Sequence, residues 1–334
     1  MPGIKFSIII CAYNPDAKTF HRLMNAVSQF APQSPEHEVI IVDNNSTPSL
    51  EANEDVALFL KDKKNTKLIV ERIAGLTSAR IAGIKESAHE WIIFFDDDNE
   101  PSKDYLVAAE QIIEQYPQVG SWGPGTISVD YTDSSTSKWL NNFRNHFQEK
   151  SGHGLKFSNE KWWQTYYPVG TGMILKKDIA IKYSNRVEKK MYSLSDRKGK
   201  SLSSGGDVQI VLTGIQIGYE AGSSDSLKMT HLINKQKANL HYLMKHAFGT
   251  AGSNLPAHFQ VAPFDLINLK IPSLGKQIKQ VYYYVKVVSF KKGWRYALIN
   301  FSAYLGELDG IIFLKPNEKE SILQKFFISF FSLK

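Results

Sequence analysis

Four short apolar segments divide the first hundred residues, and each is followed by polar residues or a glycine-containing loop. They are FSIIICA (6–12), EVIIVD (38–43), KLIVE (67–71) and EWIIFF (90–95). Segments with helical spacing separate or follow them, up to about Phe30, over 76–88 and over 102–116. Continuous apolar runs that alternate with helices are typical of parallel strands covered on both faces. The sequence therefore predicts an α/β fold with a mostly parallel sheet flanked by helices.

The residues that end these segments share one predicted position. In open sheets of this kind, ligands bind beyond the carboxyl ends of the strands. The polar residues there should meet along one rim, which makes the rim a candidate binding cleft. They are Tyr13, Asn14, Asp43, Asn44, Gly75, Asp96, Asp97 and Asp98.

The stretch WIIFFDDDNEP places three consecutive carboxylates at this rim. Like charges cannot be buried together without a counter-ion. Asp96 and Asp98 are spaced so that both can point to one spot, and hard oxygen ligands suit Mg²⁺ or Mn²⁺ together with substrate phosphates. The alternative is a solvated acidic turn that caps the helix beginning near Ser102. The preceding strand and the three other polar clusters favour the cation site.

Length and composition exclude several classes of protein. The chain has 334 residues and is 43% hydrophobic, which is enough for a large core and a smaller second domain. Its single cysteine excludes an internal disulfide framework and a cysteine-built zinc site. We see no apolar run of 18 residues and no signal peptide, so we expect no transmembrane helix and a cytoplasmic location. The predicted domains are residues 1–225 and a helical region over 226–334.

The net charge of +7 is unevenly distributed. Basic residues gather after Lys176 and again from Lys276 to Lys292, where aromatic residues lie between them. A nucleic-acid groove along the whole protein is not expected from this pattern.

Five motifs occur in an order that resembles family-2 glycosyltransferases of the GT-A (Rossmann-like) fold. They are SIIICAYN, IIVDNNST, ERIAGLTSARIAGI, FFDDDNEP and GGDVQI, and the similarity covers about residues 4–225. Each motif is weak alone, whereas five in the right order form a strong signal. The resemblance implies an inverting enzyme that uses Mn²⁺ or Mg²⁺ and moves a sugar from a nucleotide-diphosphate donor to a sugar hydroxyl.

The resemblance also implies roles for particular residues. The Tyr13 ring would stack on the base, and Asp43 or Asn44 would meet the base edge. Asp98 would be the main metal ligand, with Asp96 on the ribose or as a second metal ligand. The remaining nucleotide-sugar contacts would come from Ala12, Asn14, Gly75, Arg80 near the diphosphate or Asp97, Asp97 itself, and Gly172.

Three positions depart from the family pattern. Asn44 stands where the family more often has Asp, Ile81 where it usually has Asn, and Gly206 where it has Glu. Asn44 leaves the identity of the base open, because an amide both donates and accepts hydrogen bonds. The departures also keep a non-catalytic carbohydrate-binding scaffold of the same fold as an alternative, beside a nucleotidyltransferase.

Asp207 and His231 each have two interpretations. Asp207, in GGDVQI, resembles the family's general base, although it could simply cap the helix that begins there. His231, which we place after the last strand, corresponds to a third metal ligand in some relatives, but a histidine on an apolar stretch is more often a packed core residue. The aromatic residues near Gly170 and Gly172 fit sugar stacking or the core equally well. They are Trp162, Trp163, Tyr166 and Tyr167.

The sequence from Met229 onward is expected to be helical. An apolar stripe runs from Leu274 to Val288, and the lysines beside it fit a helix lying on an anionic membrane surface. A packed helical subdomain with a basic face, or a dimer contact, fits the same pattern. The membrane interpretation would make the acceptor a saccharide or lipid-linked saccharide in cell-surface polysaccharide assembly, at the inner face of the membrane. The oligomeric state is not indicated.

Overall fold

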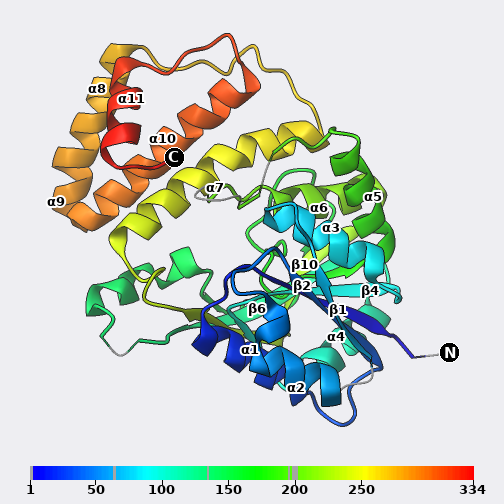
Figure 1. The fold of residues 1–334 in the computed structure, drawn as a ribbon. Coiled ribbons are helices and arrows are strands. Elements are labelled where there is room, and N and C mark those ends of the chain that lie inside the picture. Colours follow the sequence, from blue (N-terminus) through cyan, green and yellow to red (C-terminus); the bar gives the residue numbers. More distant parts are fainter. Residues whose placement is uncertain (1–2, 63–64, 134, 195, 198–201) are drawn as a thin grey trace. The chain divides into compact units, whose positions relative to one another are not determined.

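The computed structural model describes residues 3–62, 65–133, 135–194, 196–197 and 202–334, and it divides into two compact units (Figure 1). The sheet unit contains residues up to Met191 together with Ile210–Lys235, and the helical unit contains Tyr192–Gln209 and Gln236–Lys334. Helix α6 (Gly206–Gln216) contributes its first residues to the helical unit and the rest to the sheet unit. The expected domain boundary at residue 225 lies inside strand β10 (Glu220–Ile233).

The described strands of the sheet unit form one ten-stranded sheet in the order β3-β2-β1-β4-β9-β6-β10-β5, with β7 on β6 and β8 on β10. Strands β1, β2, β3 and β4 pair in parallel, as do β6 and β10, while β9 is antiparallel to both β4 and β6. The predicted α/β fold with a mostly parallel sheet is therefore confirmed. Besides β10, the strands of the sheet are β1 (Phe6–Ala12), β2 (His37–Asp43), β3 (Thr66–Val70), β4 (Trp91–Asp96), β5 (Asn99–Pro101), β6 (Val119–Tyr131), β7 (Lys150–Ser151), β8 (Lys156–Ser158) and β9 (Ile174–Lys176).

Helices cover both faces of the parallel strands, which is why β1 is buried along its whole length. On one face, Ile8 and Ile10 belong to a core shared with α1 and α4. On the other face, Ile9 lies so close to Gly83 of α3 that a Cβ there would be 2.4 Å from it. The helical segments are α1 (Ala17–Ser28), η1 (Leu50–Ala52), α2 (Glu54–Asp62), α3 (Leu76–Glu86), α4 (Tyr105–Gln115), η2 (Lys138–Phe147) and α5 (Lys177–Glu188).

Strand β10 corrects one expectation from the sequence. Helical structure was expected from Met229, but the strand continues to Ile233 and includes His231. Residues 229–231 pair with β6 on one side and with β5 on the other, so they lie inside the sheet. Pairing with two distant segments overrides the weak local pattern of such a short apolar stretch.

The helical unit consists mainly of α7 (Leu240–Val261), α8 (Leu274–Tyr282), the π-helical segment η3 (Tyr283–Val288), α9 (Ser289–Lys292), α10 (Trp294–Leu314) and α11 (Ile322–Phe330). Helices α7 and α10 pack closely against each other (Figure 1). Glycines make this approach possible, since a Cβ on Gly306 would lie 2.1 Å from the Phe248 carbonyl oxygen and one on Gly310 would lie 2.6 Å from that of Gly252.

Among the described residues, α10 is the one helix whose length and apolar composition would let it cross a membrane. Nearly half of its most apolar 18-residue window is buried. The core helix of a soluble protein, when mostly buried, has the same length and composition.

The α7–α10 crossing gives a first prediction. Gly306→Ala should lower the free energy of unfolding by about 1–3 kcal/mol, because the added methyl group overlaps a backbone carbonyl. Gly275→Ala in α8 is the matched control, since its Cβ would meet nothing within 4 Å. The control should be neutral or stabilising by up to about 1 kcal/mol. Chemical denaturation of the two variants measures the difference, and equal effects would contradict the close crossing.

Candidate functional site

The parallel register brings the predicted rim residues together. Ala12 pairs with Asp43 across β1 and β2, and Cys11 pairs with Asp96 across β1 and β4. The turn after Ala12, the loop after Asp43 and the carboxylates after Phe95 therefore leave the sheet at the same edge. The sheet unit thus has a polar rim at the carboxyl ends of its three central parallel strands.

The Tyr13–Asn14 turn presents an aromatic ring at this rim. The Tyr13 side chain is 57% exposed. Asn14 adopts the left-handed conformation with φ of 45°, its N–H donates to Ser46 Oγ at 2.9 Å, and its Oδ1 accepts from the Thr47 N–H at 2.7 Å. The turn is consequently fixed by the loop after β2 while the ring of Tyr13 stays accessible to a ligand.

Asp43 is buried and shapes that loop. Its Oδ1 accepts from the Ser46 N–H at 2.8 Å, and its Oδ2 accepts from the Leu50 N–H at 2.9 Å and from Ser49 Oγ at 3.3 Å. Both carboxylate oxygens therefore have partners within the protein. A base that contacted Asp43 would have to share or replace them.

Asn44 joins two neighbouring loops through its side-chain amide. Its Nδ2 donates to the Glu71 carbonyl at 3.0 Å and to the Ile73 carbonyl at 2.8 Å, while its Oδ1 accepts from the Gly75 N–H at 2.8 Å. A carboxylate cannot donate, so Asp could not make the first two bonds. The structure thus provides a physical reason for Asn at a position where the resembled family more often has Asp.

Arg80 lies in α3, buried beneath the acidic cluster. Its guanidinium is 3.8 Å from Asp96 Oδ1 and lies over the Phe94 ring at 5.3 Å. The neighbouring Cys11 thiol has its pKa raised to about 12, chiefly by burial, with Asp96 and Asp97 also raising it and Arg80 opposing them. The thiol therefore stays neutral, and Arg80 places a buried positive charge close to Asp96.

Asp98 and His231 form a second pair at the same edge. Asp98 is buried, and its Oδ2 lies 3.3 Å from His231 Nε2. On its other side the imidazole Nδ1 is 2.8 Å from the Phe147 carbonyl oxygen. A carbonyl can only accept, so Nδ1 carries the proton and Nε2 faces the carboxylate.

This arrangement fits a divalent cation. Histidines that bind metals usually donate their other ring N–H to a carbonyl or carboxylate, as His231 does to Phe147. Two neighbouring ligands of an octahedral ion with bonds of about 2.1 Å lie about 3.0 Å apart, which is close to the separation of Asp98 Oδ2 and His231 Nε2. No three His, Cys, Asp or Glu side chains within the described ranges converge on a metal position. A cation here would need further ligands from water or a bound phosphate.

The predicted metal ligand Asp96 is grouped with Arg80, whereas Asp98 is grouped with His231. The sequence interpretation did not single out Asn99, which lies between the two. Its Oδ1 accepts from the Asp96 N–H at 3.1 Å, and its Nδ2 donates to Asp98 Oδ1 at 3.0 Å. Its position directly after the three carboxylates could have identified Asn99 as part of the site. The role of the Phe147 carbonyl could not be predicted, since a backbone group has no sequence signature.

The position of Gly172 leaves no room for a side chain. Its φ is 71°, and a Cβ would lie 2.5 Å from the Met229 methyl and 2.8 Å from the Tyr105 hydroxyl. Of the aromatic residues nearby, Tyr167 is fully buried and its hydroxyl donates to the Glu160 carbonyl at 2.8 Å, so it belongs to the core. Trp162 is exposed and keeps a surface that could stack on a sugar.

Asp207 lies in the first turn of α6, in the part of that helix that belongs to the helical unit. The other predicted site residues belong to the sheet unit. Asp207 is half-buried and lies at the positive end of the helix dipole. Its predicted part in catalysis is taken up below as a proposal.

The chain is similar to known proteins in its family pattern and in its fold. The family model described as glycosyl transferase family 2 matches residues 7–184, which is more than half of the chain. No curated protein sequence matches significantly. A mannosyltransferase from Pyrobaculum calidifontis, crystallised with GDP-Man and Mn²⁺, is 14% identical with a TM-score of 0.53, covering 91% of this chain and 86% of that one.

Two further solved structures are similar. GalNAc-T7 with UDP, GalNAc and Mn²⁺ is 13% identical with a TM-score of 0.50, and the match covers 98% of this chain but only 57% of that one. TarS 1–349 of S. aureus is 13% identical with a TM-score of 0.42, over 95% of this chain and 93% of that one. At these identities the two structures with the higher TM-scores support the fold alone.

The Asn44 network gives a second prediction. Asn44→Asp should lower the free energy of unfolding by about 1–3 kcal/mol, because the Glu71 and Ile73 carbonyls lose their donor and gain a facing carboxylate. Asn159→Asp is the matched control, since Asn159 is an exposed asparagine outside the left-handed region and should change stability by less than about 0.5 kcal/mol. Urea denaturation compares the two, and equal stability of both variants would contradict a structural role for the amide.

Proposed function

This chain belongs to glycosyl transferase family 2 and is a glycosyltransferase, and from that premise we propose that it is an inverting, metal-dependent enzyme. It transfers a sugar from a nucleotide-diphosphate donor to a sugar hydroxyl. The single observation that supports the proposal most is the chain of contacts from Asp98 through His231 to the Phe147 carbonyl. These contacts lie at the carboxyl ends of the strands, where sheets of this kind bind ligands. A nucleotide diphosphate would supply the negative charge that such a cation site lacks.

In this proposal, the donor lies along the rim of the sheet unit. The accessible ring of Tyr13 stacks on the base. Because the side chains of Asp43 and Asn44 hold the surrounding loops, contacts to the base edge come from the backbone of those loops. Arg80 and Asp96 lie on the diphosphate and ribose side, where the buried guanidinium offsets the charge of the acidic cluster.

Asp98 and His231 hold the divalent cation, which is Mn²⁺ or Mg²⁺. When bound, such an ion neutralises the diphosphate and makes it a better leaving group. The structurally similar mannosyltransferase and GalNAc-T7 were crystallised with Mn²⁺ and with donor-type ligands, which supports the same requirement here.

Asp207 acts as the general base. It takes the proton of the acceptor hydroxyl as the oxygen forms its bond to the anomeric carbon, while the bond from that carbon to the diphosphate oxygen breaks and the electron pair leaves with the diphosphate. Attack from the opposite side of the ring inverts the anomeric configuration.

The acceptor is a saccharide, which we propose is carried by a lipid during cell-surface polysaccharide assembly at the inner face of the cell membrane. The support comes from the helical unit, in which many aromatic and basic side chains are exposed. A carrier lipid would keep the acceptor at a membrane surface, so an enzyme that binds there would meet it at high local concentration.

A thermal-shift panel tests the proposed donor and cation together. The purified protein is heated with UDP-, GDP-, dTDP- and CMP-sugars, each with Mn²⁺ and with EDTA. A ligand that binds the native state raises the melting temperature by mass action, so one base should give a shift that requires the cation. Sugar transfer undiminished in EDTA would overturn metal dependence, and no shift with any donor would overturn the proposed donor class.

The cation pair gives a third prediction. Asp98→Asn and His231→Gln should each abolish the Mn²⁺-dependent part of the donor shift and reduce transfer by more than the roughly 10–100-fold cost of losing an outer-shell partner. Asp104→Asn is the control, since Asp104 is an exposed neighbour in the chain whose side chain caps nothing. Wild-type transfer by the His231 variant would remove this residue from the proposed site.

The proposed base gives a fourth prediction. Asp207→Asn should reduce transfer by about 10²–10⁴-fold while leaving the donor-induced thermal shift unchanged, because the amide cannot take the acceptor proton. Transfer is measured by release of the nucleotide diphosphate in the presence of acceptor. A loss of donor binding together with transfer would instead mean that Asp207 is structural.

A further inference from the structure

The helical unit exposes an unusual number of large apolar side chains. The stripe predicted over residues 274–288 is not covered, since Leu274, Ile278, Tyr282 and Val285 are all at least half exposed. Phe290, on the short helix α9, is 92% exposed. Exposed apolar surface of this extent usually marks an interaction site. The other exposed apolar residues of this region are Ile267, Tyr283, Trp294, Phe313, Ile322, Phe326 and Phe330.

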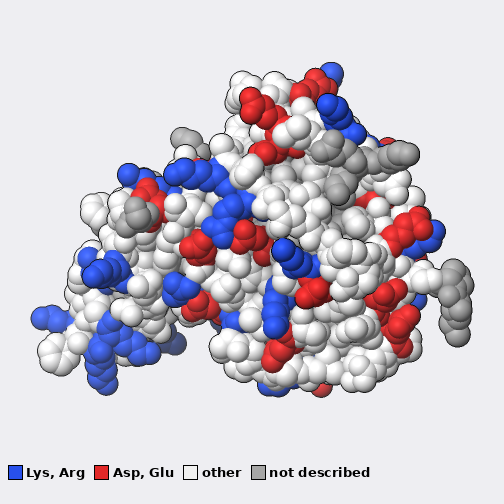
Figure 2. Space-filling view, turned by 90° about the horizontal axis from the view of Figure 1, so that it is seen from below, with Lys and Arg blue, Asp and Glu red and all other residues white. Residues whose placement is uncertain are grey.

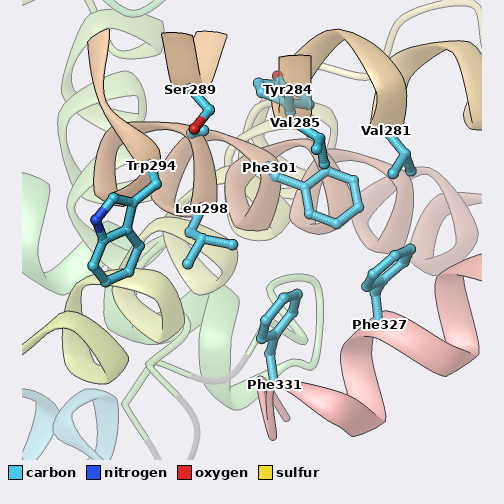
Figure 3. Close-up of a pocket in the computed structure, with 10 residues that line it drawn as sticks. Val281, Tyr284, Val285, Ser289, Trp294, Leu298, Phe301, Phe327 and Phe331 are labelled. Atoms are coloured by element: carbon cyan, nitrogen blue, oxygen red, sulfur yellow. The ribbon is translucent and has the colours of Figure 1, made fainter.

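A cavity of about 240 Å³ opens within this surface. Figure 3 shows that side chains from η3, α10 and α11 converge on it, among them Val285, Leu298 and Phe327. Phe301 forms its inner wall and meets the Phe327 ring edge-on at 5.0 Å. Trp294 lies on one side and is 52% exposed. The lining of the cavity is almost wholly apolar, so the cavity suits hydrocarbon rather than a polar ligand.

The volume of the cavity also suits part of a chain. An engineered apolar cavity of about 150 Å³ binds benzene. The larger space here can therefore take several methylene groups of an alkyl or isoprenoid chain. Since the cavity is partly open to solvent, such a chain could enter while the rest of its molecule stays outside.

Charge distinguishes this region from the rest of the chain. Residues 266–306 contain seven Lys and Arg and no Asp or Glu, and the remaining 33 basic residues of the protein equal its 33 acidic ones. The whole net charge of +7 thus comes from these 41 residues. Figure 2 shows Lys and Arg gathered over this part of the helical unit. The basic residues are Lys270, Lys276, Lys279, Lys286, Lys291, Lys292 and Arg295.

From these observations, we propose that the helical unit docks on an anionic lipid bilayer through α8, η3, α9 and the start of α10, and that one lipid hydrocarbon chain enters the cavity lined by Phe301 and Leu298. The lysines meet lipid phosphates, and the exposed aromatic residues enter the interface. Trp294, with the Arg295 guanidinium 4.5 Å from its ring, sits where an amphipathic aromatic residue would lie between headgroups and chains.

A second copy of this chain fits the surface less well. Two identical faces would bring two sets of seven positive charges together, and no acidic residue within 266–306 could offset them. An anionic bilayer instead attracts each of these charges and accepts the apolar side chains between them. The charge pattern therefore selects the bilayer as the occupant.

This inference deepens the proposed function and rests on it for one point, that the lipid present is the carrier of the acceptor. The docking itself does not require sugar transfer, so each can fail alone. Transfer to a water-soluble acceptor is measured in parallel with lipid binding. Vesicle binding without transfer would overturn the proposed function, and transfer without vesicle binding would overturn the docking.

Vesicle sedimentation with the full chain tests the docking surface. Vesicles of phosphatidylglycerol and phosphatidylcholine should bind the protein, and vesicles of phosphatidylcholine alone should bind it much more weakly. The double variant Lys286→Gln/Lys291→Gln should reduce partitioning onto the vesicles by about 25-fold. Each basic residue near an anionic surface raises the partition coefficient about fivefold. Lys319→Gln is the matched control, in the loop after α10 and beyond the basic segment, and it should bind like the wild type.

The cavity is tested separately with a free chain. Brominated dodecanoate should quench the fluorescence of Trp294, which is obtained as the difference between the wild type and Trp294→Phe. Leu298→Phe fills the cavity and should weaken quenching by about tenfold or more. Each methylene group that is excluded from the cavity should lower the binding constant of the chain about fourfold. Val285→Phe, at the exposed rim, is a second filling variant that preserves the core. Ile322→Phe adds the same bulk outside the cavity and should change nothing.

The outcomes separate the two parts of the proposal. Equal quenching of wild type and both filling variants would overturn the chain site. Equal binding to charged and neutral vesicles, or no binding to either, would overturn the docking. A dimer in sedimentation that Phe290→Ser dissociates would show that a second copy covers this face, and that result would also overturn the proposal.

Discussion

The rest of the sheet unit depends on the burial of β1 on both faces. All seven of its residues are buried, and its parallel partners β2 and β4 are nearly as apolar. Polar residues cannot be placed inside such a layer without large cost, so they are confined to the strand ends. Parallel pairing then puts those ends at one edge, with Ala12 beside Asp43 and Cys11 beside Asp96. The chemical character of the rim is therefore a consequence of hydrophobic packing.

Beyond the strand ends, side chains rather than regular structure fix the loops. Asp43 accepts from backbone N–H groups of the loop that follows it, and Asn44 connects to the loop after β3. The Asn14 side chain closes the same network by accepting from Thr47. Residues that resemble ligand contacts in sequence thus also support the loops of the rim. They fix the loops of the rim and leave the Tyr13 ring exposed.

The sequence could predict those parts of the fold that local patterns determine. The strands 6–12 and 38–43 and the helix beginning at Leu76 were foreseen within two residues, because buried strands and helices leave periodic apolar patterns. The full length of β10 was not foreseen, since it depends on pairing with β5 and β6. For His231 the two interpretations were not exclusive. The ring is partly buried and bonded to the Phe147 carbonyl, and that bond is what directs Nε2 toward Asp98. Only the tertiary structure could show this.

The apolar stripe over 274–288 illustrates the same limit in the helical unit. Its helical spacing was visible in the sequence, but spacing cannot tell whether a partner within the chain covers the stripe. In the structure α10 packs on α7 through its glycines, and Phe327 of α11 packs on Phe301 of α10. Much of the stripe is left open, beside lysines that no nearby acid in the sequence neutralises. Burying this surface against water-soluble protein would require a partner with both an apolar face and an excess of acid. A bilayer with anionic headgroups has both properties without any specific shape. Salt should weaken the proposed docking by screening the charges while leaving the apolar contacts in place.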